Sequence, residues 1–575
     1  MKQFLNFWMF VLLALVTGCT KDNIVLIDPI ETDDSEDLIA NTVFTQTVNV
    51  VFSTDGNATV TGTNEDFTVS IIGNDVTIVY SGEEYVMYEL SGTTNDGFFK
   101  IYSAKKQGIT LNNAFITNPN GAAINVQGPT AEPNKGKRTF IVLNGNNSLA
   151  DGTSYTDTPV GEDEKAALFG EGQFIFSGEG RLDVTAEGKN GIVSDDYLSF
   201  KSGEVYVTSS AGHGIRGKDH ILVSGGDIQV NVSADMKKGF STDGYVVING
   251  GTTYINVTGG AAYDSEDGEY TGSAGIKADR YFKIKGGNLT IINEGTGGKG
   301  ISIDGNGYFS GGQVDVYAHG SNYGSGGGGG FPGGGGSSSS NSVSAKGIKC
   351  DGNLVFTGGR INVFSTSHEA IEAKGSITIS DGEVRGVSQS DDAINSGGDF
   401  TISGGYVYGF SAGNDGLDAN GNFYIKDGVV FATGTNAPEV AIDANTEGGY
   451  KLYLTGGTLI AIGGLENGSS LTQSCYSASS WSPETYYSLT VGSKTYVFYT
   501  SSSGGTPLVV SGSTTPILTS GVTISGGTSY FGYMLFEDPT VSGGTSVSLS
   551  SYTGGNGGGG PGGGGGPGGG GHGPF

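Results

Sequence analysis

Residues 346–445 decide the fold, because they repeat one pattern. In register they are KGIKCDGNLVFTGGRINVFSTSH (346–368), EAIEAKGSITISDGEVRGVSQS (369–390), DDAINSGGDFTISGGYVYGFSAG (391–413) and NDGLDANGNFYIKDGVVFATGTN (414–436). An apolar residue that follows a Gly or Ala marks the period, and these markers are Ile348, Ile371, Ile394, Leu417 and Ile442. The markers are 23, 23, 23 and 25 residues apart. A fixed period in this range predicts a solenoid.

The same marker can be followed toward the N-terminus. Earlier markers are Phe98, Ile124, Leu168, Ile192, Ile215, Phe240, Ile276 and Ile301. Two longer steps carry extra residues, an acidic segment at 260–272 and a Gly/Ser segment at 320–342. Because the period resumes after each, we expect both segments to be loops that leave the coil.

Each repeat holds three short runs in which apolar and polar residues alternate, as in Leu354/Phe356 and Ile361/Val363. Alternation predicts strands with one buried face. Three such strands in each coil of ~23–25 residues predict a parallel β-helix whose coils stack ~4.8 Å apart. A glycine pair such as Gly358-Gly359 recurs between the second and third strands, which indicates a tight turn with positive φ.

Composition excludes some classes of function. The chain has 575 residues, 106 of them glycine, and a formal net charge of −29. Without a basic stripe to neutralise phosphates, the chain is not expected to bind nucleic acid. Three cysteines cannot form a disulfide framework. The net charge is compatible with a soluble exported protein or a binder of cations. We also expect a monomer.

The N-terminus predicts export. Residues 1–18 hold Lys2 and an apolar run from Phe4 to Val16, which is typical of a signal peptide. The text VTGC (16–19) resembles a bacterial lipobox, so Cys19 is the expected lipidated residue. An ordinary cleaved signal with an incidental cysteine is the alternative. The acidic tether 19–42 follows, and Lys21-Asp22 resembles a surface-export signal. We therefore expect an outer-membrane lipoprotein at the cell surface, with a lipid anchor as its only membrane contact.

The remaining boundaries follow from changes in the pattern. Strand-like alternation without the repeat predicts an N-terminal β cap at 43–95, ahead of the β-helix at 96–465. The period is lost beyond it, and strand-like runs rich in Tyr, Ser and Thr predict a C-terminal β cap at 466–553. The Gly/Pro tail 554–575 cannot bury a core and is expected to be disordered.

Stacking turns equal repeat positions into surface ladders. The ladders two residues before and one residue after the marker change from basic or neutral to acidic at Glu369. Carboxylates one coil apart would lie roughly 5 Å from each other and repel, unless solvent, protons or a cation separate them. Oxygen ligands suit Ca²⁺. The expected ligands are Glu369, Glu372, Asp391, Asp392, Asn395, Asp415, Asp418 and Asp443. A solvated acidic face is the alternative interpretation.

Residues near the ladder are candidates for glycan contacts. Lys346, Lys349 and Lys374 lie close to it, and Tyr406, Tyr408 and Tyr424 could stack on sugars. A lysine could also serve as the base of a lyase, although such lysines are more often solvated surface residues.

The order of motifs resembles a bacterial carbohydrate-binding family, once catalogued as a domain of unknown function. The motifs are a Thr/Val-rich leader, SGTTNDG (91–97), GAAINV (121–126), the coils, a Gly/Pro insertion and a Ser/Tyr-rich end. The resemblance covers roughly residues 43–555. It implies a right-handed parallel β-helix similar to polysaccharide lyases, calcium binding, and association with cellulose and acidic plant polysaccharides.

Two texts, DDAIN (391–395) and NDGLD (414–418), also look like the Asp-Asp-Gly-Ile-Asp calcium segment of β-helix pectate lyases. Ala393, Asn395 and Asn414 depart from that segment. The leading hypothesis is a surface lipoprotein that binds polysaccharide with calcium and without catalysis. A lyase acting on uronate-rich glycan and a structural or adhesive surface protein are the alternatives.

Overall fold

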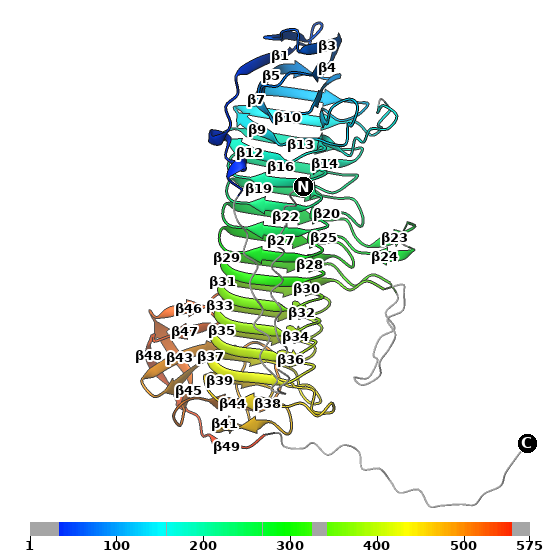
Figure 1. Cartoon of the computed structure of the whole chain (residues 1–575). Coiled ribbons are helices and arrows are strands. Elements are labelled where there is room, and N and C mark those ends of the chain that lie inside the picture. The colour runs from blue at the N-terminus through cyan, green and yellow to red at the C-terminus, as the bar shows by residue number, and fades with distance from the viewer. Residues whose placement is uncertain (1–33, 157, 267, 325–341, 555–575) are drawn as a thin grey trace, which may run out of the picture.

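The computed structural model describes residues 34–156, 158–266, 268–324 and 342–554. The predictions for the signal segment, Cys19, most of the Gly/Ser insertion and the C-terminal tail concern residues outside these ranges. The described chain is all-β, with large and mainly parallel sheets that form one elongated column (Figure 1). Its helical elements are two single turns of 3-10 helix, η1 (Ser35–Asp37) and η2 (Ile39–Asn41). Within the described ranges, no helix is long and apolar enough to cross a membrane.

One face of the column is a 14-stranded sheet built from the strands that contain the marker residues. Apart from the antiparallel pair β3–β4, its neighbouring strands pair in parallel. The strands are β3 (Phe67–Ile72), β4 (Asn74–Tyr80), β6 (Gly97–Ser103), β8 (Ile124–Gln127), β11 (Ala166–Gly170), β14 (Asn190–Ser194), β17 (Ile215–Gly217), β20 (Lys238–Thr242), β25 (Ala274–Ala278), β28 (Lys299–Ile303), β30 (Lys346–Cys350), β32 (Ile371–Ala373), β34 (Ile394–Ser396) and β36 (Leu417–Ala419).

The strand register confirms the repeat. Ile348 pairs with Ile371, which pairs with Ile394, which pairs with Leu417, and a bridge continues the row to Ile442. All of these side chains are fully buried. One early marker is wrong by one residue, because Phe99 rather than Phe98 pairs with Ile124 and points into the core.

The other faces belong to a 27-stranded sheet with two columns of strands. The first column contains β5 (Val86–Thr94), β7 (Gln107–Asn118), β9 (Thr139–Asn144), β12 (Phe174–Gly178), β15 (Tyr197–Phe200), β18 (His220–Val223), β21 (Tyr245–Ile248), β26 (Tyr281–Ile284), β38 (Leu452–Leu454) and β40 (Ser470–Leu471). The second contains β10 (Asn146–Asp151), β13 (Arg181–Ala186), β16 (Glu204–Ser209), β19 (Asp227–Val232), β22 (Thr252–Val257), β27 (Asn288–Asn293) and β39 (Thr458–Ile462).

Long strands join the two columns in the later repeats. They are β29 (Asn306–Ala318), β31 (Leu354–Ser365), β33 (Ile377–Ser388), β35 (Phe400–Ser411) and β37 (Phe423–Thr433). A glycine pair lies in the middle of β29, β31 and β35, and Asp-Gly takes its place in β33 and β37. The register shifts there between β29 and β31. Gly359 has φ +86°, and a Cβ on it would lie 2.8 Å from the backbone of Gly311. The predicted glycine turn is therefore a bulge that bends one continuous strand.

Apolar side chains fill the space between the sheets. Phenylalanines from successive coils stack there, as Phe309 does on Phe356 with ring centroids 4.8 Å apart. Strands β1 (Gln46–Phe52) and β2 (Thr59–Thr61) lie at the N-terminal end, and β1 already pairs in parallel with β5. The acidic segment 260–272 forms a hairpin of β23 (Ala262–Asp264) and β24 (Glu269–Thr271) beside the column (Figure 1).

The C-terminal segment supplies two structures. Strands β41 (Cys475–Ala478), β44 (Leu508–Ser511) and β49 (Ser550–Tyr552) pair antiparallel beyond β39 at the end of the column. An antiparallel six-stranded sheet lies beside the last coils (Figure 1). Its strands are β42 (Tyr486–Val491), β43 (Lys494–Tyr499), β45 (Ile517–Ser525), β46 (Thr528–Tyr530), β47 (Leu535–Glu537) and β48 (Thr540–Ser546). A second core, which includes Tyr408, Phe431 and Phe498, joins this sheet to β33, β35, β37 and β39.

Candidate functional site

The acidic ladder lies on the last strands of the 14-stranded sheet. In β32, β34 and β36 the marker is buried and the next side chain points outward, so Glu372, Asn395 and Asp418 line up in register. The bridge from Leu417 to Ile442 brings Asp443 beside Asp418. Glu369, Asp392 and Asp415 precede the three markers and are buried. All the predicted ligands thus belong to one face, but the structure divides them into two groups.

The first group, Glu369, Glu372 and Asp391, has cationic partners. Lys346 Nζ lies 3.0 Å from Glu369 Oε2 and 2.6 Å from Glu372 Oε2. His368 Nδ1 contacts Glu369 and lies 2.9 Å from Asp391 Oδ2. These two cations balance two of the three negative charges of the group.

The pKa values of His368, Glu369 and Asp391 agree with these ion pairs. Burial opposes charge on His368, but its hydrogen bonds to Asp391 and Glu369 outweigh burial and raise its pKa to about 9. Burial also opposes charge on Glu369 and Asp391, yet the contact with His368 leaves the pKa of each carboxyl lowered. His368 is therefore protonated at neutral pH, and Glu369 and Asp391 are ionised.

The second group has no such partners. Asp415, Asp418 and Asp443 each offer a carboxylate oxygen, and these oxygens all lie within 4.8 Å of one another. Within the described chain, no Lys, Arg or His forms an ion pair with any of the three. Asp392 and Glu466 border the group: the Asp415 N–H donates to Asp392 Oδ1 at 3.1 Å, and Glu466 is hydrogen-bonded to Thr446.

Burial and mutual repulsion raise the pKa values of the second group. Burial, followed by the charge of Asp443, raises the pKa of Asp415 to about 9. Burial raises the pKa of Asp418 and of Asp443 to about 6 and that of Glu466 to about 8. Burial with the charges of Asp418 and Asp415 raises the pKa of Asp392 well above its usual value. A site without a cation must therefore hold protons among its carboxylates.

The donor chemistry of this second group fits a hard divalent cation. All its donors are oxygens, and Ca²⁺ takes six to eight oxygen ligands from carboxylates, carbonyls and water. The Val440 N–H donates to Asp415 Oδ1 at 2.5 Å, and Asn395 Nδ2 donates to Asp392 Oδ2 at 3.0 Å. These bonds hold Asp415 and Asp392 in place. Both oxygens of Asp392 accept a hydrogen bond, so Asp415, Asp418 and Asp443 are the carboxylates that would hold the cation.

The three predicted lysines differ in their surroundings. Lys346 is buried between Glu369 and Glu372, and these charges keep its pKa raised in spite of burial. Lys349 and Lys374 both pair with Asp351, and Lys374 lies 2.7 Å from it with a largely exposed side chain. Each of the three lysines thus has a carboxylate partner.

Two functional candidates, His368 and Lys299, are absent from the residues that the sequence predicted. Lys299 lies one coil before Lys346 in the same register, and burial lowers its pKa to about 8. Lys238 lies two coils before Lys299, with Ala274 between them, and burial again lowers its pKa to about 8. Both lysines occupy the ladder position two before the marker, which is the signal that could have selected them.

The predicted aromatic platforms are mostly covered. Tyr408 is buried in the second core, and Tyr406 stacks on Tyr530 with ring centroids 3.7 Å apart. The six-stranded sheet thus occupies the ring faces that a sugar would need. Tyr424 is partly exposed and stacks on Tyr453 with centroids 5.1 Å apart, so its position is the one of the three open to a ligand.

Comparisons with known proteins place the chain in a family. A family model described as carbohydrate-binding domain-containing protein matches residues 72–393, which is more than half of the 575 residues. The chain therefore belongs to the family of carbohydrate-binding domain-containing proteins. No curated protein matches the sequence. A solved structure described as the polysaccharide lyase-like protein from C. thermocellum, in a gadolinium derivative, is 22% identical, with a TM-score of 0.37. The match covers 47% of this chain and 96% of that chain.

Proposed function

We propose that this chain is a calcium-dependent polysaccharide-binding protein without catalytic activity. Membership of the carbohydrate-binding family supports the glycan as ligand. The observation that carries calcium dependence is the group Asp415, Asp418 and Asp443, whose carboxylates gather within 4.8 Å without a cationic partner among the described residues. A Ca²⁺ ion held there would neutralise the group and could also coordinate oxygens of a glycan, uronate carboxylates above all.

The proposal includes architecture and location. We propose that the parallel sheets form a right-handed parallel β-helix over 96–465, between an N-terminal cap at 43–95 and a C-terminal cap at 466–553. We further propose that lipidation of Cys19 anchors the protein to the outer membrane at the cell surface, with residues 19–42 as tether. Treatment of intact cells with an impermeant label tests the surface location, and an unlabelled protein contradicts it.

A pull-down tests the function. The purified protein is mixed with cellulose, with insoluble pectin and with an uncharged glycan matrix, with calcium or with chelator. We expect retention on at least one glycan in calcium and release by chelator. Asp415→Asn should mimic chelator, whereas Asp381→Asn, which changes an exposed carboxylate in a turn of the 27-stranded sheet, should behave as the parent. Failure to bind any glycan would favour a structural or adhesive role.

A polysaccharide lyase is the second candidate, and Lys299 is the observation that favours it. A lyase needs a base to take the proton beside a uronate carboxylate, and a lysine with a pKa near the working pH suits that task. Burial gives Lys299 a pKa of about 8, and Lys299 lies in the row that leads to the acidic ladder. A lyase would release unsaturated products from polygalacturonate, which ultraviolet absorbance detects. This absorbance, together with its loss in Lys299→Met, would establish lyase activity in place of binding alone.

A further inference from the structure

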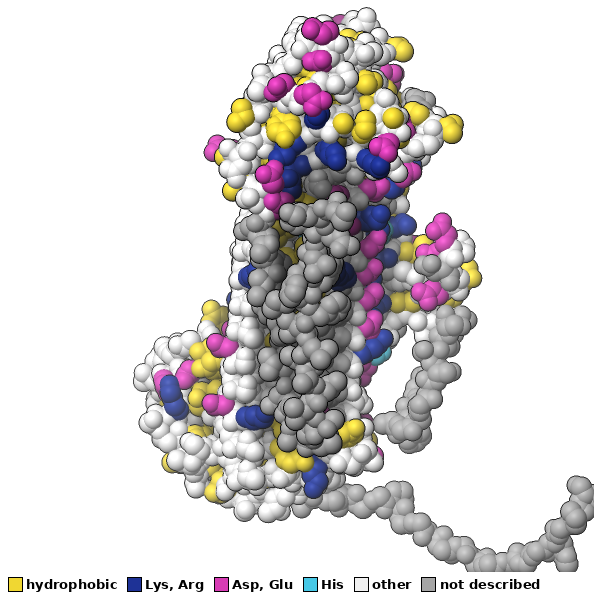
Figure 2. Space-filling model, viewed as in Figure 1, with side chains coloured by type: hydrophobic (Ala, Val, Ile, Leu, Met, Phe, Trp, Pro, Cys, Tyr) yellow, Lys and Arg dark blue, Asp and Glu magenta, His cyan; other side chains and the backbone are white. Residues whose placement is uncertain are grey.

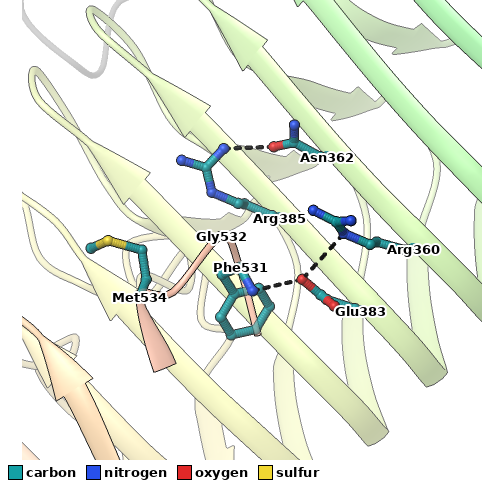
Figure 3. A pocket seen from close by; sticks show the side chains of 7 residues that line it. All are labelled: Arg360, Asn362, Glu383, Arg385, Phe531, Gly532 and Met534. Atoms are coloured by element: carbon teal, nitrogen blue, oxygen red, sulfur yellow. Dashed lines mark hydrogen bonds and ion pairs between the residues drawn. The ribbon is translucent and has the colours of Figure 1, made fainter. Parts of the chain in front are cut away.

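A cleft separates the column from the six-stranded sheet, away from the acidic ladder. Its floor comes from the outer faces of β31 and β33, and its wall from the turn between β46 and β47 (Figure 3). The cavity has a volume of about 210 Å³. Pockets for drug-sized ligands typically start near 300 Å³, so this cleft suits one sugar unit or its charged substituent. No residue of the acidic ladder lines this cleft.

The wall of the cleft is fixed in an unusual backbone conformation. Phe531 and Tyr533 have φ of +57° and +72°, which non-glycine residues seldom adopt. The Phe531 N–H donates to Glu383 Oε1 at 2.6 Å, and the Phe531 ring is buried against Tyr408. These contacts hold the turn against β33. Strain of this kind is often found where a turn must shape a binding site.

The floor carries two guanidinium groups that the described chain leaves mostly unsatisfied. Arg385 Nη1 donates to Asn362 Oδ1 at 2.5 Å, but Nη2 donates to no described residue and the buried Nε has no acceptor among them. Arg385 forms no ion pair with a described carboxylate, and burial lowers its pKa. Arg360 Nε lies 3.8 Å from Glu383, too far for a hydrogen bond, and half of its side chain is exposed.

The charge balance of the cleft is positive. Two arginines face one carboxylate, and that carboxylate already accepts the Phe531 N–H. Arg385 is half-buried, and its cationic group has the Tyr408 ring 5.8 Å away but no carboxylate in an ion pair. Such a charge is costly to desolvate, and arginine keeps its charge under almost all conditions. An oxyanion in the cleft would supply the missing acceptors, because the planar guanidinium fork matches carboxylate and sulfate oxygens. Met534 lines the same cleft and offers apolar surface to the ring of a sugar.

We propose that this cleft binds the oxyanion substituent of an acidic sugar, a carboxylate or a sulfate ester, through Arg385 and Arg360. The choice of a sugar rests on the proposed function, whereas the choice of an oxyanion rests on the cleft alone. The site is a second glycan subsite, on another sheet from the acidic ladder, and it needs no calcium. A chain with both sites would select acidic over neutral glycans even where chelator removes the cation.

Ligand-observed NMR titrations of the purified protein in chelator test this proposal. The probes are galacturonate, galactose 6-sulfate, inorganic sulfate and uncharged galactose. We expect the two acidic sugars to bind and galactose not to bind. Binding by sulfate as strongly as by the sugars would overturn the sugar part of the proposal, and equal binding of galactose would overturn the oxyanion part.

Variants assign the binding to the cleft. Hydrogen bonds to charged groups contribute about 1.5 kcal/mol or more, so Arg385→Gln and Arg360→Gln should each weaken the acidic sugar about tenfold. Arg360 is half exposed, so its variant should fold even if Arg385→Gln does not. Arg181→Gln, at an arginine paired with Asp183 on another part of the column, is the matched control and should bind as the parent. Unchanged binding in Arg360→Gln would overturn the proposal.

The two proposals fail in different ways. Asp415→Asn should leave binding of galacturonate in chelator unchanged, because Asp415 lies outside the cleft. If that variant abolishes galacturonate binding, the cleft is not the site. If no polysaccharide is retained in the pull-down while Arg360-dependent galacturonate binding persists, the cleft stands and the proposed function does not.

Discussion

The two halves of one ladder carry opposite charge on the same backbone. Lys238, Lys299 and Lys346 occupy the position two before the marker in β20, β28 and β30, and Glu369 and Asp392 occupy it in the next two coils. In Figure 2, acidic and basic side chains follow one edge of the column. The buried markers, by contrast, are apolar throughout.

The stacked fold constrains the residue type at the marker position but not the charge at the ladder position. A marker must be apolar because it faces the core, and any other residue there would leave a buried polar group or a cavity. The ladder position lies at the end of a short strand and holds lysine in some coils and a carboxylate in others, so stacking does not dictate its charge. The change from lysine to carboxylate is therefore not a requirement of the stacked fold. Lys346 is where the two halves meet.

The largest expected effect is at this junction. Lys346→Met removes the cation between Glu369 and Glu372, which leaves Glu372 without a cationic partner and Glu369 with His368 alone. Removal of one partner of a buried ion pair costs about 3–5 kcal/mol. Unfolding in denaturant should show a loss of this size. Lys349→Met is the control: its partner Asp351 is less buried, so the loss should stay below about 1 kcal/mol. Equal losses in the two variants would show that the junction is not special.

The second effect concerns the acidic half alone. Asp415→Asn removes a charge from the group of Asp415, Asp418 and Asp443 but keeps an acceptor for the Val440 N–H. Loss of an outer partner of a metal site costs about 10–100-fold in affinity, and a direct ligand should cost at least that. Calorimetric titration with Ca²⁺ measures the change.

The same variant should stabilise the calcium-free protein at pH 8, because Asp415 must take up a proton on folding and asparagine needs none. A stability loss instead, with unchanged calcium affinity, would contradict the assignment of Asp415.

The third effect concerns neutralisation within the ladder. His368 is protonated between Glu369 and Asp391, so His368→Gln should cost about 1.5 kcal/mol at pH 7. Because the folded pKa of His368 is raised to about 9, its contribution is complete below the ordinary value of 6.5 and is lost as pH rises through 9. The parent and the variant should thus converge at high pH. His319→Gln, in a ring stack with Tyr317, should show no such dependence.

The smallest effect is the pH dependence of the calcium-free parent. The folded pKa values of Asp415, Asp418 and Asp443 are raised, so the folded state holds protons that the unfolded state has lost. These carboxylates therefore make stability fall as pH rises, most clearly from about 6.5 to about 9, because below 6.5 the buried His213 and His220, whose folded pKa values are lowered, act in the opposite sense. The loss should reach at least about 1.4 kcal/mol, the free energy of a tenfold change in the proton affinity of one carboxylate. Calorimetric melting across this range measures it, and saturating Ca²⁺ should flatten the curve. A calcium-free protein that gains stability over this range would contradict the raised pKa values.

The repeat spacing in the sequence predicted those parts of the molecule that recur in every coil. The rows of markers, the glycine bulges and the acidic ladder all follow from a spacing of 23–25 residues, because each coil repeats the environment of the last. Phe98 is misplaced by one residue in an early coil where the pattern is weaker, and a shift of one residue exchanges the buried and exposed faces of a strand.

Contacts between distant segments were beyond that argument. Tyr406 bonds to Glu537, 131 residues away, and no repeat relates the two. The fate of the tyrosine platforms and the cleft at Arg385 could thus not be predicted. The sequence also did not show that the acidic ladder divides into a group with cationic partners and a group without them. That division depends on which carboxylates His368 and Lys346 contact in three dimensions.

The six-stranded sheet changes how the column can open. In a stack of coils each repeat contacts only its neighbours, so coils can separate one after another from a free end. The second core ties β33, β35, β37 and β39 sideways through one sheet, so these four coils must open together or not at all. Their backbone amides should exchange with solvent as one cooperative block, whereas the coils of β13 and β16 should exchange in steps. The acidic ladder lies on the braced block, so its strands should keep their spacing until the whole block opens.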